Sequence, residues 1–373
     1  MKILVTGAGG FIGKNLISVL HNMDGCEVLE FHAKDGHECL QMYCAVCDFV
    51  FHLAGVNRPE DEAEFETGNV GFTRILTGFL AEGSRCPIVF SSSVQTELDN
   101  PYGRSKRGAE KILREYEEKT GTQVALYRLP NVFGKWCRPD YNSVIATFCH
   151  HTANGLPVHV RDENQMLRLV YIDDVVAEFV RALKETGTKQ GDFYIVPEVY
   201  ERRLGDIANQ IQVFSLCAET LEIPNQADAF TKKLYSTYLS YLPEEKLQYA
   251  LAAHSDARGL FAEFLRTEDR GQLSINVTRP GHVKGNHWHH TKHEIFLAVS
   301  GEGVIRLRKI GERSVIEIPV RGDRLEPVII PPGCAHMLEN SGDVDLVTVM
   351  WANEPFDPRR PDTFYLDVRE KET

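Results

Sequence analysis

The sequence lacks any run of about 18 apolar residues, the length that a membrane-spanning helix requires. It also lacks an excess of positive charge, because 41 Lys and Arg face 53 Asp and Glu and the formal net charge is −12. A chain of this charge is not expected to take nucleic acid or an anionic membrane as its main partner. Internal repeats and low-complexity segments are absent as well. We therefore expect ordinary globular domains.

The cysteines do not form the pattern of a disulfide framework. There are nine of them, an odd number, spread along the chain. Free thiols in a reducing compartment account for this usage better than disulfides do. The first residues, MKILVTGAGGFIG, are not typical of a signal peptide, because glycines interrupt the apolar run at once. The sequence therefore predicts a cytoplasmic protein.

The length and the composition predict two domains. The chain has 373 residues, 43% hydrophobic and 25% charged. Single hydrophobic cores usually stop growing below this length, so two domains are the default.

A glycine-rich turn between a strand and a helix opens the chain. Residues 2–6 are apolar and β-branched, which favours a buried parallel strand, and residues 14–21 have helical periodicity. Gly7, Gly10 and Gly13 lie between them. Glycines in this position let the backbone approach a pyrophosphate, which the helix N-terminus then holds. The context predicts a dinucleotide site.

The next strand, predicted over residues 28–32, should end at the adenine ribose of the cofactor. Glu30 could accept a hydrogen bond from the ribose 2′-hydroxyl, but it lies inside the apolar run rather than after it. His32 and Lys34 follow, and their positive potential would suit a 2′-phosphate. These two residues favour NADPH as the predicted cofactor.

A tyrosine and a lysine four residues apart begin a long predicted helix. Tyr102 and Lys106 lie on one helix face at this spacing. An ammonium group near a phenol lowers the pKa of the phenol, so that it can exchange a proton with a carbonyl or an alcohol. Residues 87–93 form a predicted strand with three serines at its end, and a serine hydroxyl there could bond the same oxygen.

These motifs resemble the extended short-chain dehydrogenases/reductases that act on nucleotide sugars, over roughly residues 1–240. The resemblance implies a catalytic set of Ser93, Tyr102 and Lys106, with Ser92 as the alternative serine. It implies that Asn131 and Arg58 contact the substrate together with Ser93. The cofactor-binding residues that it implies, together with the two from the second strand, are Gly7, Gly10, Phe11, Ile12, Gly13, His32, Lys34, Leu53, Ala54, Gly55, Asn69, Tyr102 and Lys106.

The C-terminal part changes to short alternating strands from residue 272, after predicted helices over residues 204–214 and 243–253. Several short strands with Gly and Pro turns indicate a sandwich or barrel. His287 and His289 point to one side of a predicted strand, Glu294 returns on the next, and His336 arrives from a later hairpin. Three imidazoles and a carboxylate suit zinc, iron, nickel or manganese.

This part resembles the cupins in both of their sequence motifs. One departure is Leu325, where the second motif usually begins with glycine; Gly322 could start that turn instead. The predicted fold class is therefore an α/β Rossmann domain, a doubly wound parallel sheet, over residues 1–245. An all-β cupin, a double-stranded β-helix or jelly roll, follows over residues 246–373.

Two further groups are given a structural interpretation. Cys44 and Cys47 have the outline of a metal knuckle, but no second pair follows at a usable spacing, so core or loop thiols are favoured. His150 and His151 lack a partner set and are predicted to be solvated or next to the substrate. Strand alternation points His290 away from His289.

Together the two parts resemble the bifunctional enzymes of capsular polysaccharide and O-antigen synthesis, most clearly over residues 52–59, 128–139 and 281–292. This resemblance implies a UDP-linked 4-keto-6-deoxy-N-acetylhexosamine as substrate, on the route to UDP-N-acetyl-L-fucosamine. The cupin would invert C3, and the reductase would then reduce the C4 ketone with NADPH. One divalent metal per chain, zinc by preference, and a homodimer are also implied.

Two other functions remain open at this stage. The N-terminal part could be a 4,6-dehydratase or C4-epimerase with tightly held NAD, or the cupin could be a non-catalytic structural or sensory module. In dehydratases of this family, acidic residues usually follow the catalytic serine. Val94 and Gln95 stand there, which disfavours dehydration.

Overall fold

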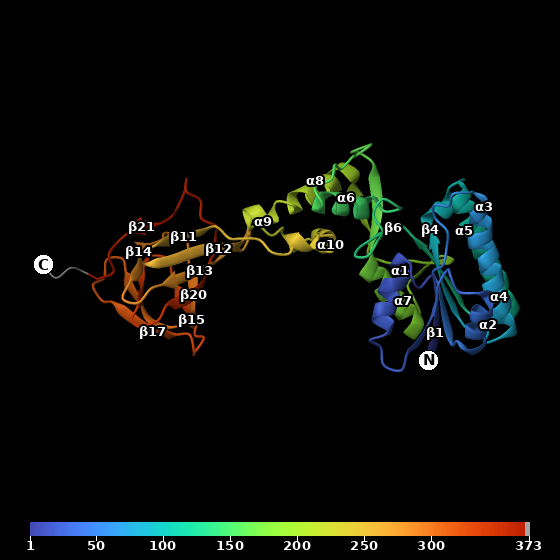
Figure 1. Cartoon of the computed structure of the whole chain (residues 1–373), viewed down its shortest axis with the longest axis horizontal. Helices are drawn as coiled ribbons and strands as arrows, with labels where there is room; N and C mark the ends of the chain where they lie inside the picture. Colours follow the sequence, from blue (N-terminus) through green and yellow to red (C-terminus); the bar gives the residue numbers. More distant parts are fainter. Residues whose placement is uncertain (370–373) are drawn as a thin grey trace. The chain divides into compact units, whose positions relative to one another are not determined.

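The computed structural model describes residues 1–369 of the chain (Figure 1). It divides into two compact units. The first contains Met1–Gln212 and Lys233–Pro243, and the second contains Val213–Lys232 and Glu244–Thr373. Within residues 1–369, no helix is both long and apolar enough to cross a bilayer. The predicted boundary between residues 245 and 246 stays a prediction.

A seven-stranded sheet forms the centre of the first unit. Its order is β2-β1-β3-β4-β5-β9-β8, and all neighbours pair in parallel except β8 with β9. The strands are β1 (Lys2–Thr6), β2 (Glu27–Phe31), β3 (Phe49–His52), β4 (Ile88–Ser93), β5 (Val124–Leu129), β8 (Lys189–Gln190) and β9 (Phe193–Tyr194). Strands β1, β3 and β4 are buried in nearly every position, because helices cover both faces.

Helices pack on both faces of this sheet. In Figure 1, α1 (Phe11–Leu20) and α7 (Ile172–Lys184) cover one face. Helices α2 (His37–Val46), α4 (Phe72–Glu82) and α5 (Pro101–Thr120) cover the other. The predicted doubly wound fold is confirmed. Because the strands are parallel, all their carboxyl ends meet at one edge, which is where such folds bind ligands.

The sequence of residues 69–76 predicts a helix that begins at Asn69, but the helix begins earlier. It starts with α3 (Ala63–Phe65), widens into a π-helical turn over Glu66–Gly71 and continues as α4. Asn69 therefore lies inside a helix rather than at its start. The polar residues before position 69 hid the first turns, since they give no apolar periodicity.

A smaller sheet and several helices lie beyond the carboxyl ends of the parallel strands. The sheet has the order β10 (Tyr200–Arg203), β7 (Met166–Tyr171), β6 (Asn131–Phe133). The helices are α6 (Val144–Ala153), α8 (Leu204–Phe214) and α10 (Ala229–Leu239), whereas α9 (Cys217–Thr220) belongs to the second unit. The prediction of a helix over residues 204–214 is confirmed.

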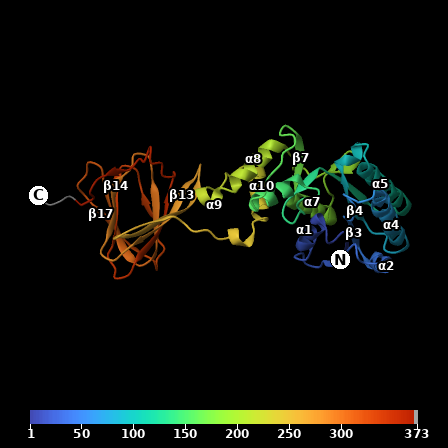
Figure 2. The same cartoon turned by 45° about the horizontal axis from the view of Figure 1, so that its top comes forward.

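Two antiparallel sheets build the second unit. One is β11 (Ala253–Asp256), β12 (Gly259–Thr267), β13 (Gly271–Thr278), β20 (Leu346–Ala352), β15 (Glu294–Ser300) and β18 (Val328–Ile330). The other is β17 (Ile316–Arg321), β16 (Glu302–Lys309), β19 (Cys334–Asn340), β14 (Val283–Trp288) and β21 (Phe364–Tyr365). Figure 2 shows β14 and β17 on one wall of this unit and β13 on the other. An apolar cluster between the sheets includes Phe296, Ile305, Ile330 and Leu338. The predicted cupin-type fold is confirmed.

The start of this unit was predicted wrongly. Residues 243–253 were expected to be helical, but a short 3-10 turn at Glu244–Lys246 leads into β11. Strand β12 also precedes residue 272, where the strands were expected to begin. A bulge between Glu263 and Leu265 breaks the two-residue alternation of β12, so the strand pattern was not visible.

Candidate active site and metal centre

The glycine-rich turn brings the backbone of β1 against the β3 end. Gly7 has a φ of +72°, and a Cβ on it would lie 2.7 Å from the Ala54 nitrogen. A Cβ on Gly13 would collide with the Gly7 carbonyl oxygen. Gly10 caps α1 without a side-chain hydrogen bond, so the first N–H groups of the helix have no capping oxygen. The turn can therefore hold a pyrophosphate, as predicted.

A cavity of about 1400 Å³ opens at the carboxyl ends of the strands. It exceeds the ~300–1,000 Å³ of ordinary ligand pockets, and it has room for a dinucleotide and a second ligand. Most of the predicted site residues line it. They are Gly7, Gly10, Phe11, Ile12, Gly13, Leu53, Gly55, Arg58, Ser93, Tyr102, Lys106 and Asn131.

Ser93, Tyr102 and Lys106 lie together in this cavity. Burial raises the pKa of Tyr102 to about 12, although a hydrogen bond with Ser93 opposes the rise. The phenol is thus protonated near neutral pH, the state that can give a proton to an alkoxide. The Lys106 Nζ lies 5.9 Å from the Tyr102 ring centroid and donates to the Ser91 carbonyl oxygen at 3.0 Å. The pKa of the phenol is therefore raised, not lowered as its spacing from Lys106 predicted.

The two candidate serines have different partners. The Ser92 hydroxyl is buried and donates to the Glu110 carboxylate at 2.5 Å, so it is turned away from Tyr102. Ser93 hydrogen-bonds with Tyr102. This arrangement supports Ser93 over Ser92 as the serine of the site.

Asn69 does not line the cavity, although it was predicted to bind the cofactor. Its amide nitrogen donates to the Val56 carbonyl at 3.0 Å and to the Ser105 hydroxyl at 2.8 Å. Its oxygen accepts from the Val56 N–H at 2.8 Å. Asn69 thus connects the π-helical turn to α5 and to the loop after β3, and it supports the site from behind.

His32 lies at the glycine-rich turn, where a Cβ on Gly9 would be 3.4 Å from its Nδ1. Its Nε2 is 3.4 Å from a carboxylate oxygen of Glu30, whose other oxygen lies 3.4 Å from His21. Lys34 is exposed. The acidic and basic candidates for ribose recognition are therefore neighbours, and the choice between NADPH and NADH stays a prediction.

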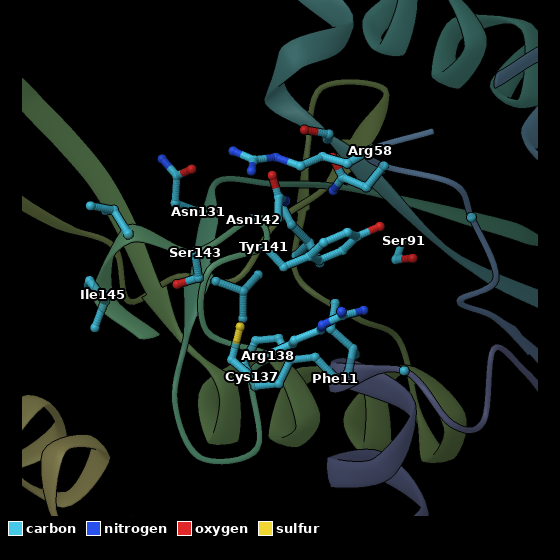
Figure 3. A pocket seen from close by; sticks show the side chains of 18 of the residues that line it. Phe11, Arg58, Ser91, Asn131, Cys137, Arg138, Tyr141, Asn142, Ser143 and Ile145 are labelled. Atoms are coloured by element: carbon cyan, nitrogen blue, oxygen red, sulfur yellow. The ribbon is translucent and has the colours of Figure 1, made fainter. Parts of the chain in front are cut away.

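The outer half of the cavity contains charged residues that were not among the predicted site residues. Arg138 and Arg161 line it together with the predicted Arg58 and Asn131. Figure 3 shows Arg58 and Arg138 entering from opposite sides, with Tyr141 between them. Arginine binds phosphate oxygens through paired N–H groups, so this half can hold a diphosphate. Arg138 lies within the 128–139 stretch that carries the resemblance, but no role was predicted for it, and Arg161 lies in an irregular segment outside the quoted motifs.

The four predicted metal ligands meet inside the second unit. One ligand atom from each of His287, His289, Glu294 and His336 can be chosen so that all four lie within 4.8 Å of one another. His287 pairs with His336 across β14 and β19, His289 follows β14, and Glu294 begins β15. The Glu294 Oε2 lies 3.5 Å from the His289 Nε2 and 3.1 Å from the His336 Nε2.

These residues fit a divalent metal. The His289 Nε2, the Glu294 Oε2 and both ring nitrogens of His336 are buried without a hydrogen-bond partner within the described chain. Burial lowers the pKa of His287 to about 4 and so favours its neutral, coordinating form. Burial would raise the pKa of Glu294, but the neighbouring His289 and His336 imidazoles outweigh it and hold the pKa below its usual range. Buried polar atoms without partners are costly, and a coordinated cation would satisfy them.

Asp362, which no sequence pattern indicated, holds the loop that bears His289. Its backbone carbonyl lies 2.5 Å from the His289 Nδ1, a contact that leaves Nε2 facing the cluster. Its carboxylate accepts 2.9 Å hydrogen bonds from the N–H groups of His290, Thr291 and Lys292. Asp362 is 73 residues from His289 in the chain, so spacing could not reveal the contact.

Comparison with known proteins agrees with both halves. A family described as "NAD dependent epimerase/dehydratase family" matches residues 3–196, and the "Polysaccharide biosynthesis C-terminal domain" matches residues 254–364. The crystal structure of the capsular polysaccharide assembling protein CapF from Staphylococcus aureus matches with a TM-score of 0.93. It is 48% identical and covers 99% of this chain and 100% of that one. The chain is a CapF-like member of the NAD-dependent epimerase/dehydratase family.

Another relative extends over the whole CapF-like chain. It is the Pseudomonas aeruginosa (strain PA103) protein named UDP-2-acetamido-2,6-beta-L-arabino-hexul-4-ose reductase, 41% identical over 99% of this chain and 100% of its own length. The UDP-glucuronic acid 4-epimerase from Bacillus cereus is 21% identical with a TM-score of 0.52, over 58% of this chain and 84% of its own, and shows the shared fold. The family of the CapF-like chain supports a nicotinamide cofactor in the N-terminal unit.

Proposed function

We propose that this chain is a bifunctional UDP-sugar epimerase and reductase. In this proposal the cupin unit inverts C3 of a UDP-linked 4-keto-6-deoxy-N-acetylhexosamine. The reductase unit then reduces the C4 ketone with NADPH, on the route to UDP-N-acetyl-L-fucosamine. The observation that carries the proposal is the cavity that joins the glycine-rich turn to Ser93, Tyr102 and Lys106. The name of the P. aeruginosa relative, a reductase of a UDP-linked 4-ulose, supports the substrate class.

The reduction requires a proton donor beside the ketone. A bound nicotinamide would supply hydride for C4, and Tyr102 would protonate the oxygen that becomes an alkoxide. Ser93 donates a hydrogen bond to the same oxygen, and the Lys106 ammonium stabilises negative charge nearby. Arg58, Asn131 and the two further arginines of the outer cavity would bind the UDP diphosphate.

The epimerisation requires removal of the C3 proton, which is acidic because it lies beside the C4 ketone. His287, His289, Glu294 and His336 would hold the metal, zinc by preference. A divalent metal bound there would polarise a carbonyl oxygen or stabilise an enolate. Asp362 keeps the His289 ring oriented towards the cluster.

The substrate assignment is tested by supplying the 4-keto UDP-sugar together with NADPH. The purified chain should oxidise NADPH with a one-to-one yield of the C4 alcohol, and it should leave the UDP-linked 4,6-hydroxy parent sugar unchanged. Absorbance at the reduced nicotinamide band and NMR of the product measure this. Conversion of this 4,6-hydroxy parent sugar without added cofactor would instead identify a 4-epimerase or dehydratase with tightly held NAD.

NADPH should bind more tightly than NADH, because His32 and Lys34 would contribute positive charge beside a 2′-phosphate. Fluorescence titration of both cofactors into the cofactor-free protein measures the ratio. The double substitution His32→Ala/Lys34→Ala should reduce this preference, while the exposed Lys119→Ala in the last turn of α5 should preserve it. Equal or reversed affinities in the wild type would contradict the assignment.

The side-chain pattern of one sheet supports the predicted homodimer, because the sheet has polar residues on its inward face and apolar residues on its outward face. On β13 the residues that face inward are polar, Gln272, Ser274, Asn276 and Thr278, and all are buried. The outward side chains of β13, β20 and β15 are apolar and partly buried or exposed. They are Leu273, Ile275, Val277, Val347, Val349, Trp351, Ile295, Leu297 and Val299. A sheet face that meets water normally shows the opposite pattern.

We therefore expect this outer face, defined by those nine residues, to pair with the same face of a second copy, as a two-fold axis requires. Among the described residues, Leu366 and Val368 near the C-terminus pack with Ala335 and Met337 of the other sheet, away from this face. Light scattering should give twice the 42.1 kDa chain mass. Leu297→Glu with Val349→Glu should give monomers, and Ile316→Glu, an exposed position on β17, should not. A monomeric wild type would contradict this expectation.

A further inference from the structure

One buried carboxylate in the reductase unit has no part in the mechanism above. Glu110 lies on α5, one helical turn beyond Lys106, and is only 7% exposed. Buried carboxylates are costly unless they are paired and hydrogen-bonded, so the contacts of this one must offset its burial.

Glu110 joins α5 to two neighbouring strands. One of its oxygens accepts the Ser92 hydroxyl at 2.5 Å and the Arg128 Nε at 3.1 Å, and its other oxygen accepts the Arg128 Nη2 at 2.8 Å. Ser92 and Arg128 are register partners on β4 and β5. Ser93 is the next residue on β4, and Asn131 follows Arg128 by three positions. The carboxylate thus connects the helix of Tyr102 and Lys106 to the strands that end in the other site residues.

The arginine of this cluster is itself held in place. Its guanidinium carbon lies 3.6 Å from the Phe193 ring centroid, and its side chain is 22% exposed. A charge-assisted, two-pronged contact in such a shielded place is stronger than one in water. The geometry around Glu110 is therefore rigid.

Lys106 needs a nearby negative charge. Its ammonium donates to the Ser91 carbonyl and lies 4.7 Å from the Phe90 ring centroid. Burial lowers the pKa of Lys106 to about 8, and the charge of Glu110 opposes this lowering. The other titratable groups near Lys106 are Tyr102 on α5 and His52 at the end of β3. Burial, assisted by Lys106, lowers the pKa of His52 to about 3, so His52 is neutral and supplies no negative charge.

We propose that Glu110 is a positioning residue of the reductase site, which holds α5 against β4 and β5 and supplies the negative charge that keeps Lys106 protonated. This inference rests on the proposed reduction. It gives Glu110 two separable effects: one depends on the reach of the side chain, and the other depends on its charge.

Glu110→Gln tests the effect of charge. Glutamine keeps the length of the side chain and can still accept from Ser92, but it removes the negative charge. In the pH profile of kcat/KM for NADPH-dependent reduction, the alkaline limb should move to lower pH by about one unit, because Lys106 loses its proton more easily. A residue with only a structural role would lower the rate without moving this limb.

Two matched variants separate charge from position. Glu110→Asp keeps the charge but shortens the reach towards Ser92 and Arg128, so kcat should fall while the alkaline limb stays in place. Glu97→Gln removes another carboxylate near Arg128, at 3.9 Å, but this one is 73% exposed, so solvent screens it. The limb should not move in this variant. If Glu110→Gln leaves the limb at the wild-type pH, or if Glu97→Gln moves it equally, the inference is wrong.

Loss of Glu110 leaves a partly buried Arg128 without its partner, which could prevent folding. Glu110→Gln combined with Arg128→Met removes both charges, and the same shift of the limb is expected from this folded double variant. Because Lys106 lines the cavity, its charge also affects the affinity for the anionic cofactor, so the pH dependence of the NADPH Kd should shift likewise. If the wild type binds NADPH but reduces no keto-sugar, the proposed function fails while this titration still decides the role of Glu110.

Discussion

Replacing Tyr102 with phenylalanine should lower NADPH-dependent reduction by about a hundredfold or more, the usual scale for the loss of a positioned proton donor. The phenol is the group whose proton the alkoxide would take, and burial keeps it protonated by raising its pKa to about 12. Phenylalanine preserves the ring, which lies 5.9 Å from the Phe65 ring centroid, so folding should be unaffected. Steady-state oxidation of NADPH measures the effect.

The control for this variant is cofactor affinity. The NADPH Kd of Tyr102→Phe should equal that of the wild type within a factor of about two, since the glycine-rich turn is untouched. Its unfolding temperature should equal that of the wild type. A second variant, Ser92→Ala, should retain far more activity than Ser93→Ala, because Ser92 bonds with Glu110 rather than Tyr102. Near-wild-type oxidation of NADPH by Tyr102→Phe would overturn the assignment.

Removing a metal ligand should have the second large effect. The wild type is expected to contain about one divalent metal per chain, and His336→Ala or His287→Ala should lose it. Binding to the folded state stabilises that state by about 4 kcal/mol when free metal exceeds its Kd a thousandfold. The unfolding transition of the second unit should therefore fall by on the order of 10 °C. Metal analysis and calorimetry measure both quantities.

His290→Ala is the matched control, because His290 neighbours His289 but lies outside the four-residue cluster. It should keep its metal and its stability. The ligand variants should also stop exchanging the C3 proton of the keto-sugar with solvent deuterium, yet oxidise NADPH when given the epimerised ketone. Folded, metal-depleted protein that exchanges C3 at the full rate would leave the metal with a structural role.

Local patterns predicted the features that depend on neighbouring residues. The glycine-rich turn, the spacing of Tyr102 and Lys106 and the cupin motif each lie within a short segment, so backbone periodicity already orients their side chains. The same reasoning failed where local geometry departs from regular periods. The π-helical turn at Asn69 and the bulge in β12 are such places, and both shifted the predicted elements.

The sequence by itself therefore determined the two fold types, the glycine-rich turn and the four clustered side chains of the second unit. The tertiary structure decided the contacts that join distant segments. It distinguished Ser93 from Ser92, because the Ser92 hydroxyl bonds with Glu110. It also brought Arg138 and Arg161 into the cavity and Asp362 into contact with His289. The physical reason is that these contacts depend on which strands are neighbours and where loops return. Hydrogen-bond geometry and burial set them, and neither has a period along the chain.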